Sequence, residues 1–167
     1  RPRRRRWWLC QPRRSQPSPR IPTRALLGRR PAPVKLYLDR AIVLGTAKLG
    51  EADRIVTLLT PGHGKVRAVA KGVRRQKSHM SGRVLPFSQL TVQCYRGREL
   101  DTLVQVEVQA ANQILREDLD RLGQAAGIVE AAERVAQEGH EQPELYRLVE
   151  RALGSLCRAN SPVLLAA

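Results

Sequence analysis

The feature that most constrains this chain of 167 residues is a change in the spacing of its apolar residues near residue 109. Between residues 37 and 109, apolar side chains alternate with polar ones or fill short runs separated by Pro and Gly, which is typical of β-strands. After residue 109 they recur every three or four positions, which predicts helices. An order of strands first and helices second indicates an α+β fold or two small domains.

Five segments of the first part are predicted to be strands, and no helical pattern lies between them. Turn residues such as Pro61 and Gly62, and a polar loop over residues 74–83, separate these segments. The arrangement predicts a small five-stranded β-barrel or a sandwich over residues 34–110. The expected strands are Ala41–Thr46, Ile55–Thr60, Lys65–Val73, Leu90–Tyr95 and Leu100–Val108.

The second part, residues 111–167, is predicted to be a partial helical domain. One helix runs from about residue 119 to Gly139, and the next begins at Pro143, because glycine often ends helices and proline is tolerated in a first turn. Ser161 and the residues after it have the pattern of a third helix start. That helix would be only one turn long, so we expect the chain to be a fragment of a longer protein.

The first 33 residues differ in composition from the rest. They contain eleven Arg, seven of the eleven Pro and no acidic residue, and their apolar residues follow no period. Such a segment cannot bury enough surface to fold, so we expect residues 1–33 to be a disordered basic extension. Three explanations stay open: a basic arm that binds nucleic acid, an organelle transit peptide with few serines, or translated upstream sequence before a true start at Val34.

The sequence gives little sign of catalysis or of a membrane. No apolar run has the length of a membrane span or the pattern of a signal peptide. The three cysteines are odd in number and far apart, which excludes a disulfide framework and fits a reducing cytoplasm. No phosphate-loop spacing and no nucleophile with its base are present, so we expect no enzyme activity. Glu51 and Asp53 are expected to pair with Arg54 or Lys48 and to shape the turn. The alternative that stays open is a metal-dependent nuclease that uses them as its carboxylate pair.

The stretch KVRAVAKGVRRQK, residues 65–77, has six basic residues and no acidic one. On a strand, Val66, Ala68 and Ala70 would face the barrel interior and the basic residues would face outward. A row of cations neutralises phosphates, which predicts binding of single-stranded nucleic acid with weak sequence preference. The alternative is an edge strand whose charges only prevent aggregation. The predicted binding residues are Lys65, Arg67, Lys71, Arg74, Arg75 and Lys77.

A longer ordered string resembles the N-terminal part of the RecO family of bacterial DNA repair and recombination mediators. The resemblance is dense from Val34 to about Glu107, continues more weakly through the helices and does not include residues 1–33. It is carried by LGEADRI (49–55), TLLT (57–60), HGK (63–65), AVAKGVRR (68–75), PF (86–87) and YRGRELD (95–101).

The resemblance implies an OB-fold barrel followed by a helical domain. It implies binding of single- and double-stranded DNA and annealing of complementary strands. It also implies that the protein works with RecR and single-stranded DNA-binding protein to load RecA. This work would take place in the cytoplasm, at the nucleoid. The six basic residues would form the DNA surface. Many relatives have a four-cysteine zinc site farther along, which Cys94 and Cys157 cannot replace, so we expect no cofactor and no metal in this chain. Two alternatives stay open: a generic OB-fold RNA-binding module and an inactive truncated fragment.

Overall fold

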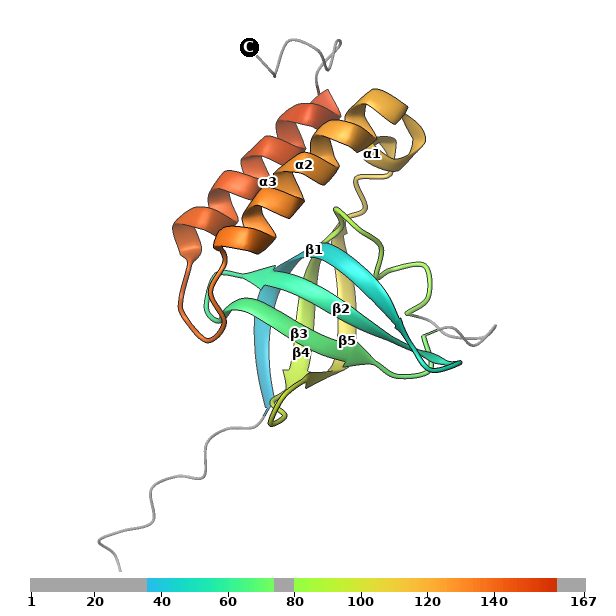
Figure 1. The fold of residues 1–167 in the computed structure, drawn as a ribbon, viewed down its shortest axis with the longest axis vertical. Coiled ribbons are helices and arrows are strands. Elements are labelled where there is room, and N and C mark those ends of the chain that lie inside the picture. The colour runs from blue at the N-terminus through green and yellow to red at the C-terminus, as the bar shows by residue number, and fades with distance from the viewer. Residues whose placement is uncertain (1–35, 74–79, 159–167) are drawn as a thin grey trace, which may run out of the picture. The chain divides into compact units, whose positions relative to one another are not determined.

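A computed structural model of the chain describes residues 36–73 and 80–158. Within these residues, five strands come first and three helices follow. Figure 1 shows how they are arranged. The predicted extension 1–33 and the predicted third helix from Ser161 lie outside the described residues. The strands are β1 (Leu36–Leu49), β2 (Asp53–Thr60), β3 (Gly64–Ala70), β4 (Gln89–Tyr95) and β5 (Asp101–Ala110), and the helices are α1 (Ile114–Glu117), α2 (Leu119–Val135) and α3 (Pro143–Arg158).

The strands form a closed barrel in the order β1-β2-β3-β5-β4, because β4 pairs back with β1. β1 has 14 residues, long enough to pair with β4 through residues 36–42 and with β2 through residues 42–49. A register shift between Val43 and Gly45 bends the strand between its two partners. β3 and β5 run parallel over only two residue pairs and close the barrel. The predicted five-stranded barrel followed by helices is confirmed.

Side chains alternate along β3 as the sequence predicts. Val66, Ala68 and Ala70 are buried in the barrel interior, and Arg67 between them is exposed. Small side chains suit this position because a five-stranded barrel has a narrow interior. The inward and outward faces of β3 are therefore as expected.

β3 ends earlier than the sequence pattern predicts, at Ala70 instead of Val73. Gly72 adopts a positive φ of 64°, which a glycine tolerates and which turns the chain out of the strand. The backbone N–H of Gly72 donates to the carboxylate of Asp53 at 2.7 Å. This bond holds the turn in place. Because β3 ends at Ala70, Lys71 lies in the turn and not on the strand.

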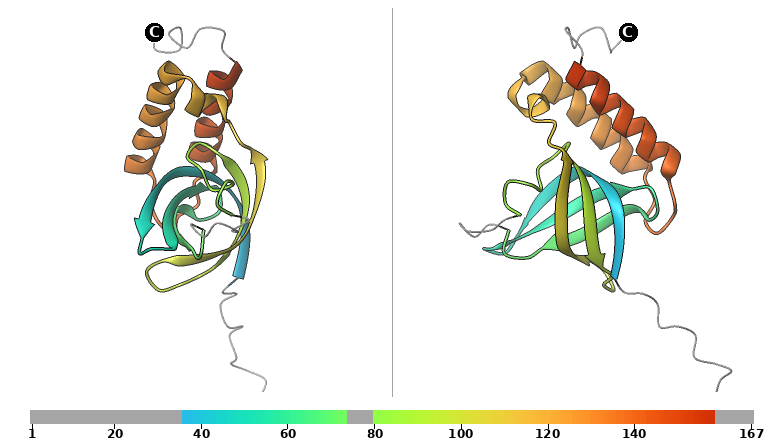
Figure 2. Two further views of the ribbon diagram at one scale, coloured as in Figure 1. Left: turned by 90° about the vertical axis from the view of Figure 1, so that its right-hand side faces the viewer. Right: turned by 180° about the vertical axis from the view of Figure 1, so that it is seen from behind.

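The helices pack over one end of the barrel, as Figures 1 and 2 show. Asp118 precedes the first residue of α2, and its side chain accepts the backbone N–H of Arg121 at 3.0 Å and caps the helix. The core between barrel and helices combines buried side chains of α1, α2 and α3 with four barrel residues: Ile42, Leu44, Leu59 and Phe87. The helical part therefore depends on the barrel for part of its core.

The apolar faces that the sequence pattern predicts for α2 and α3 are right in period and at most positions. Val129 and Ala132 of α2 and Leu153 of α3 belong to these predicted faces, and all three are buried. The exceptions include Leu119, which is 82% exposed, and Leu148, which is 59% exposed. The period alone does not decide such positions, since they depend on how α2 and α3 pack on the barrel.

The turn between β2 and β3 is joined to the connection between α2 and α3. The backbone N–H of Lys65 donates to the carbonyl of Gln137 at 2.9 Å, and that of Gly139 donates to the carbonyl of His63 at 3.1 Å. Gly64 has a φ of 65°, and a Cβ there would lie 2.3 Å from the Gln137 carbonyl oxygen. Only glycine fits this close approach, which holds the helical connection against the start of β3.

Candidate nucleic-acid interface

Two of the predicted binding residues lie on the outward face of β3, near its start. Arg67 is exposed, and its guanidinium forms no hydrogen bond or ion pair within the described part of the chain. The Lys65 ammonium donates to the main-chain carbonyl of Glu133 in α2 at 3.2 Å. An ammonium has three donors, so Lys65 keeps donors for an anion while its stem is held against the helix.

The turn between β4 and β5 brings two further cations, Arg96 and Arg98, toward the same place. The turn is tight because the Gly97 N–H donates to the carboxylate of Asp101 at 2.9 Å. A Cβ at Gly97 would lie 1.9 Å from the carbonyl oxygen of Leu100, so a larger residue would open the turn. The guanidinium carbon of Arg96 lies 5.4 Å from the centroid of the Tyr37 ring, within cation–π range.

These side chains share one concave site, which we call the basic cleft. It has a volume of about 270 Å³ and lies between the start of β3, the β4–β5 turn and the α2–α3 connection. Carboxylates also reach it, so its charge is mixed, with the cations in excess. Its charged lining residues are Lys65, Arg67, Arg96, Arg98, Glu99, Asp101 and Glu138.

The wall of the basic cleft contains a network of aromatic and polar side chains. The Tyr37 hydroxyl donates to the Asp101 carboxylate at 2.5 Å, and the Tyr37 and His63 rings lie 4.1 Å apart between centroids. The Nδ1 atom of His63 lies 3.0 Å from a carboxylate oxygen of Asp39. Burial, together with the hydrogen bond to Asp101, raises the pKa of Tyr37, so its hydroxyl stays neutral.

Two tyrosines of the barrel differ in how accessible their rings are for stacking with bases. Tyr37 is half-buried, and its ring is in contact with His63 and lies near Arg96. Tyr95 is 43% exposed at the end of β4. Base stacking is therefore more accessible at Tyr95, while Tyr37 serves as part of the wall of the basic cleft.

The predicted row of six cations is only partly visible. Lys71 is exposed in the turn after β3, at the opposite end of the strand from Lys65, and a rise of about 3.3 Å per residue separates them by roughly 20 Å. Arg74, Arg75 and Lys77 lie outside the described residues. The structure therefore groups Lys65 and Arg67 with Arg96 and Arg98.

Sequence reasoning did not select Arg96, Arg98 or His63. Two signals were available: the two arginines in the short turn RGRE between strands, and the segments YRGRELD and HGK, which contain these three residues and help to carry the family resemblance. Their closeness to β3 follows from the parallel pairing of β3 with β5, which joins residues more than 30 positions apart. Such a contact leaves no periodic pattern in the sequence.

The carboxylate pair of the nuclease alternative has a structural partner instead. Asp53 accepts the backbone N–H of Gly72, as described above. Within residues 36–73 and 80–158, no group of three or more His, Cys, Asp or Glu side chains has the geometry to hold a metal ion. Cys94 is buried in the barrel interior and Cys157 packs against the helical core, so these two do not form a shared zinc site.

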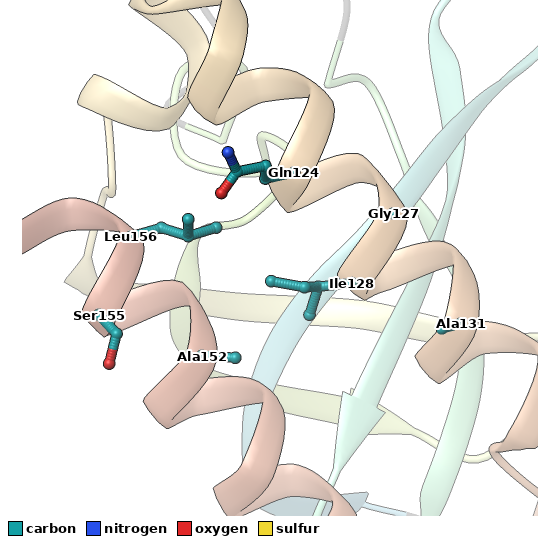
Figure 3. A pocket seen from close by; sticks show the side chains of 7 residues that line it. All are labelled: Gln124, Gly127, Ile128, Ala131, Ala152, Ser155 and Leu156. Atoms are coloured by element: carbon teal, nitrogen blue, oxygen red, sulfur yellow. The ribbon is translucent and has the colours of Figure 1, made fainter. Parts of the chain in front are cut away.

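A larger concavity, about 580 Å³, lies between α2 and α3. Figure 3 shows Leu156 and Ala152 of α3 pointing toward α2, and Ile128 pointing back toward α3. Its lining contains no charged side chain, so it is unsuited to phosphates, and the basic cleft is the candidate interface although it is smaller. The lining residues are Gln124, Gly127, Ile128, Ala131, Ala152, Ser155 and Leu156.

The strand order defines the class of this protein. A closed barrel of five strands in the order β1-β2-β3-β5-β4, followed by helices, is an OB-fold barrel with a helical part. OB-folds bind oligonucleotides on the face of their second and third strands and on the loops that follow strands one and four. The basic cleft lies at the third strand and the β4–β5 turn.

Comparison with known proteins gives the family. The model of the N-terminal part of recombination protein O matches residues 34–112, and the model of its C-terminal part matches residues 116–167. Two proteins named DNA repair protein RecO, from Bifidobacterium longum strains DJO10A and NCC 2705, are each 47% identical to the chain over 127 residues. These regions cover 75% of this chain and 53% of each relative. The chain belongs to the RecO family of DNA repair proteins, and it spans about half the length of these relatives.

None of the helices within residues 36–73 and 80–158 is long and apolar enough to cross a membrane.

Proposed function

We propose that this chain is the DNA-binding part of a repair mediator that holds single- and double-stranded DNA and anneals complementary strands. The observation that carries the proposal is the grouping of Lys65, Arg67, Arg96 and Arg98 around one cleft of an OB-fold barrel, in a chain that belongs to the RecO family. Cations beside phosphates lower the repulsion between two strands, so the strands approach and pair. This mechanism depends on charge alone and requires neither bond chemistry nor a cofactor.

The distribution of charge supports an orientation of DNA on the barrel. Residues 34–110 contain thirteen basic and six acidic residues, whereas residues 111–167 contain six basic and nine acidic ones. Phosphates are attracted to the first part and repelled by the second. The helical part then remains available for protein partners, for which we propose RecR and single-stranded DNA-binding protein, with RecA loaded as the result. We place this work at the nucleoid, in the cytoplasm.

Phosphate contacts predict a characteristic salt dependence. Each contact with a single strand contributes about −0.7 to the slope of log K against log salt concentration. If four or five cations of the barrel engage, the slope is roughly −3 to −3.5. Replacing Arg74 and Arg75 together with Ala should flatten it by up to about 1.4 and weaken binding about equally across sequences. A loss confined to particular sequences would indicate contacts with bases instead.

The test is annealing of complementary oligonucleotides coated with single-stranded DNA-binding protein. The chain should accelerate annealing, and a barrel that only binds RNA should not. Incubation with DNA and magnesium serves as the second measurement, in which the DNA should stay intact. Failure to anneal, or metal-dependent cleavage, would contradict the proposed function.

A further inference from the structure

The basic cleft has features that a surface for a continuous nucleic-acid backbone does not need. Its volume of about 270 Å³ is slightly below the roughly 300–1,000 Å³ of clefts that hold drug-sized ligands. A single phosphate-bearing nucleotide is of this size, while a continuous strand requires an open groove. The cleft is therefore suited to one unit of a strand.

One side of the cleft is closed. The α2–α3 connection forms this side with Glu138 and Gly139, and it is fixed to the β2–β3 turn by the hydrogen bonds of Lys65 and Gly139 described above. Backbone bridges also join Glu138 to Gly64 and Lys65. A strand that lies beside Arg67 and enters the cleft would meet a carboxylate and then the acidic helical part. Repulsion there favours a strand that ends inside the cleft.

A strand end can also carry more charge than any internal position. An internal phosphodiester has one negative charge, whereas a terminal phosphate monoester has a second pKa near 6 and carries about −1.5 to −2 at pH 7. It also offers three terminal oxygens as acceptors. The cleft is closed on one side and its four cationic side chains outnumber its three carboxylates, of which Asp101 already accepts from the Tyr37 hydroxyl and the Gly97 N–H. The four cations match the higher charge and larger number of acceptors of a terminal phosphate.

We propose that the basic cleft binds the terminal phosphate monoester of a nucleic-acid strand. The guanidinium groups of Arg67 and Arg98 have no hydrogen bond or ion pair within the described part of the chain, so both are available to the phosphate. Lys65 approaches from the wall side and Arg96 from above Tyr37. This inference rests on the proposed DNA binding and adds to it a preference for phosphorylated ends.

The experiment compares oligonucleotides of one sequence with and without a 5′-phosphate, and a second pair with and without a 3′-phosphate, by fluorescence anisotropy with the full chain. In at least one pair the phosphorylated strand should bind on the order of tenfold more tightly, the value of one or two charge-assisted hydrogen bonds. A deoxynucleoside monophosphate should compete only weakly, because it lacks the rest of the strand.

The decisive variant is Arg67→Ala with Arg98→Ala, which removes no hydrogen bond within the described residues. Its control is Lys48→Ala with Arg54→Ala, which also removes two cations, but from the β1–β2 hairpin. Both variants should bind DNA more weakly, and only the first should lose the preference for phosphorylated ends.

Two sets of results would overturn the inference. One is equal affinity for phosphorylated and unphosphorylated strands in both pairs, or an equal preference in the two variants. The other is a monophosphate that binds as tightly as the phosphorylated strand, because the cleft would then hold a free nucleotide. Absence of any DNA binding would instead contradict the proposed function itself.

Discussion

The barrel and the helical part are built on different kinds of core. Among the described residues, those of the barrel interior all belong to the strands and their loops, and they include Val43, Leu58 and Val92. The helical core takes Ile42, Leu44, Leu59 and Phe87 from the barrel. The dependence therefore runs mainly one way: the helices need the barrel to bury their apolar faces, whereas the barrel interior takes no residue from the described helices, which cover four apolar side chains on its outside.

The same two parts differ in charge, and this difference has a functional meaning. The barrel carries the excess of cations and the basic cleft, while the helices carry an excess of carboxylates and an apolar groove. In the proposed function, the first part holds phosphates and the second contacts protein partners. The predictions below test whether the two parts are as separable in stability and in binding as this comparison suggests.

The largest effect is expected from truncating a buried leucine in each core. Leu58 of the barrel and Leu153 of α3 are both fully buried, so replacing either with Ala should cost about 2–5 kcal/mol of stability. Leu58→Ala should increase hydrogen exchange in the barrel and helices together, because the helices depend on the barrel. Leu153→Ala should increase it in the helices alone. If the Leu153 variant loses protection from hydrogen exchange equally in the barrel and in the helices, the one-way dependence is contradicted.

A smaller effect should follow from disturbing the junction between the two parts. Gly64→Ala introduces a Cβ that would lie 2.3 Å from the Gln137 carbonyl oxygen, at a φ of 65°. The left-handed backbone alone costs about 1–2 kcal/mol, and the overlap adds to this. Gly50→Ala is the matched control, since Gly50 has a φ of 58° and open space around its Cβ position. Thermal unfolding should show a clearly larger loss for Gly64→Ala, and equal losses would mean that the junction contributes little.

The difference in charge predicts different salt dependences of DNA binding. Removing two cations from the barrel, by Arg67→Ala with Arg98→Ala, should flatten the slope of log K against log salt by about 1.4. Removing two exposed cations from α3, by Arg147→Ala with Arg151→Ala, should leave the slope unchanged. Titrations at several salt concentrations measure both slopes. A reduced slope for the α3 variant would place DNA on the helices as well.

The smallest expected effect is a loss of stability at alkaline pH. It should begin at a lower pH for a buried group of the barrel interior than for one of the helical core. Burial raises the pKa of Cys94 to about 11, above its ordinary value of 9.0. As pH rises, the thiol of the unfolded chain ionises before the buried thiol of the folded chain does. The contribution of the protonated Cys94 thiol to the stability of the fold is therefore complete below pH 9 and is lost toward pH 11. Between pH 8 and 10 the loss is about 1 kcal/mol. Burial, as the main cause, raises the pKa of Tyr146 in the helical core to about 12, above its ordinary value of 10.0. Tyr146 therefore adds to the loss of stability mainly above pH 10.

Urea unfolding at pH 8, 9 and 10 checks this prediction, with Cys94→Ala as the comparison. The variant should lose less stability than the original chain over this range. Parallel losses in the two proteins would show that other groups dominate the alkaline response, and the barrel thiol would then not report on its core.

Much of the fold was predictable because it is local in the sequence. The alternation of Val66, Ala68 and Ala70 with basic residues determined the inward face of β3, since a strand repeats every two residues. Pro143 marks the first residue of α3, as its fixed φ and missing N–H suggest. The short helix α1 was not predicted, because four residues leave no period to detect.

The composition of the candidate site was less predictable. The sequence indicated that Lys65 and Arg67 face outward, and the family resemblance indicated DNA. Only the tertiary structure brings Arg96 and Arg98 beside them and moves Lys71 away, because barrel closure joins β3 to β5 and the Gly72 turn ends β3 early. The sequence by itself determined which side chains are apolar or charged and how each element alternates, since these follow from periods of two to four residues. Contacts between distant segments decided which cations share a cleft, because packing of strands and helices leaves no periodic trace along the chain.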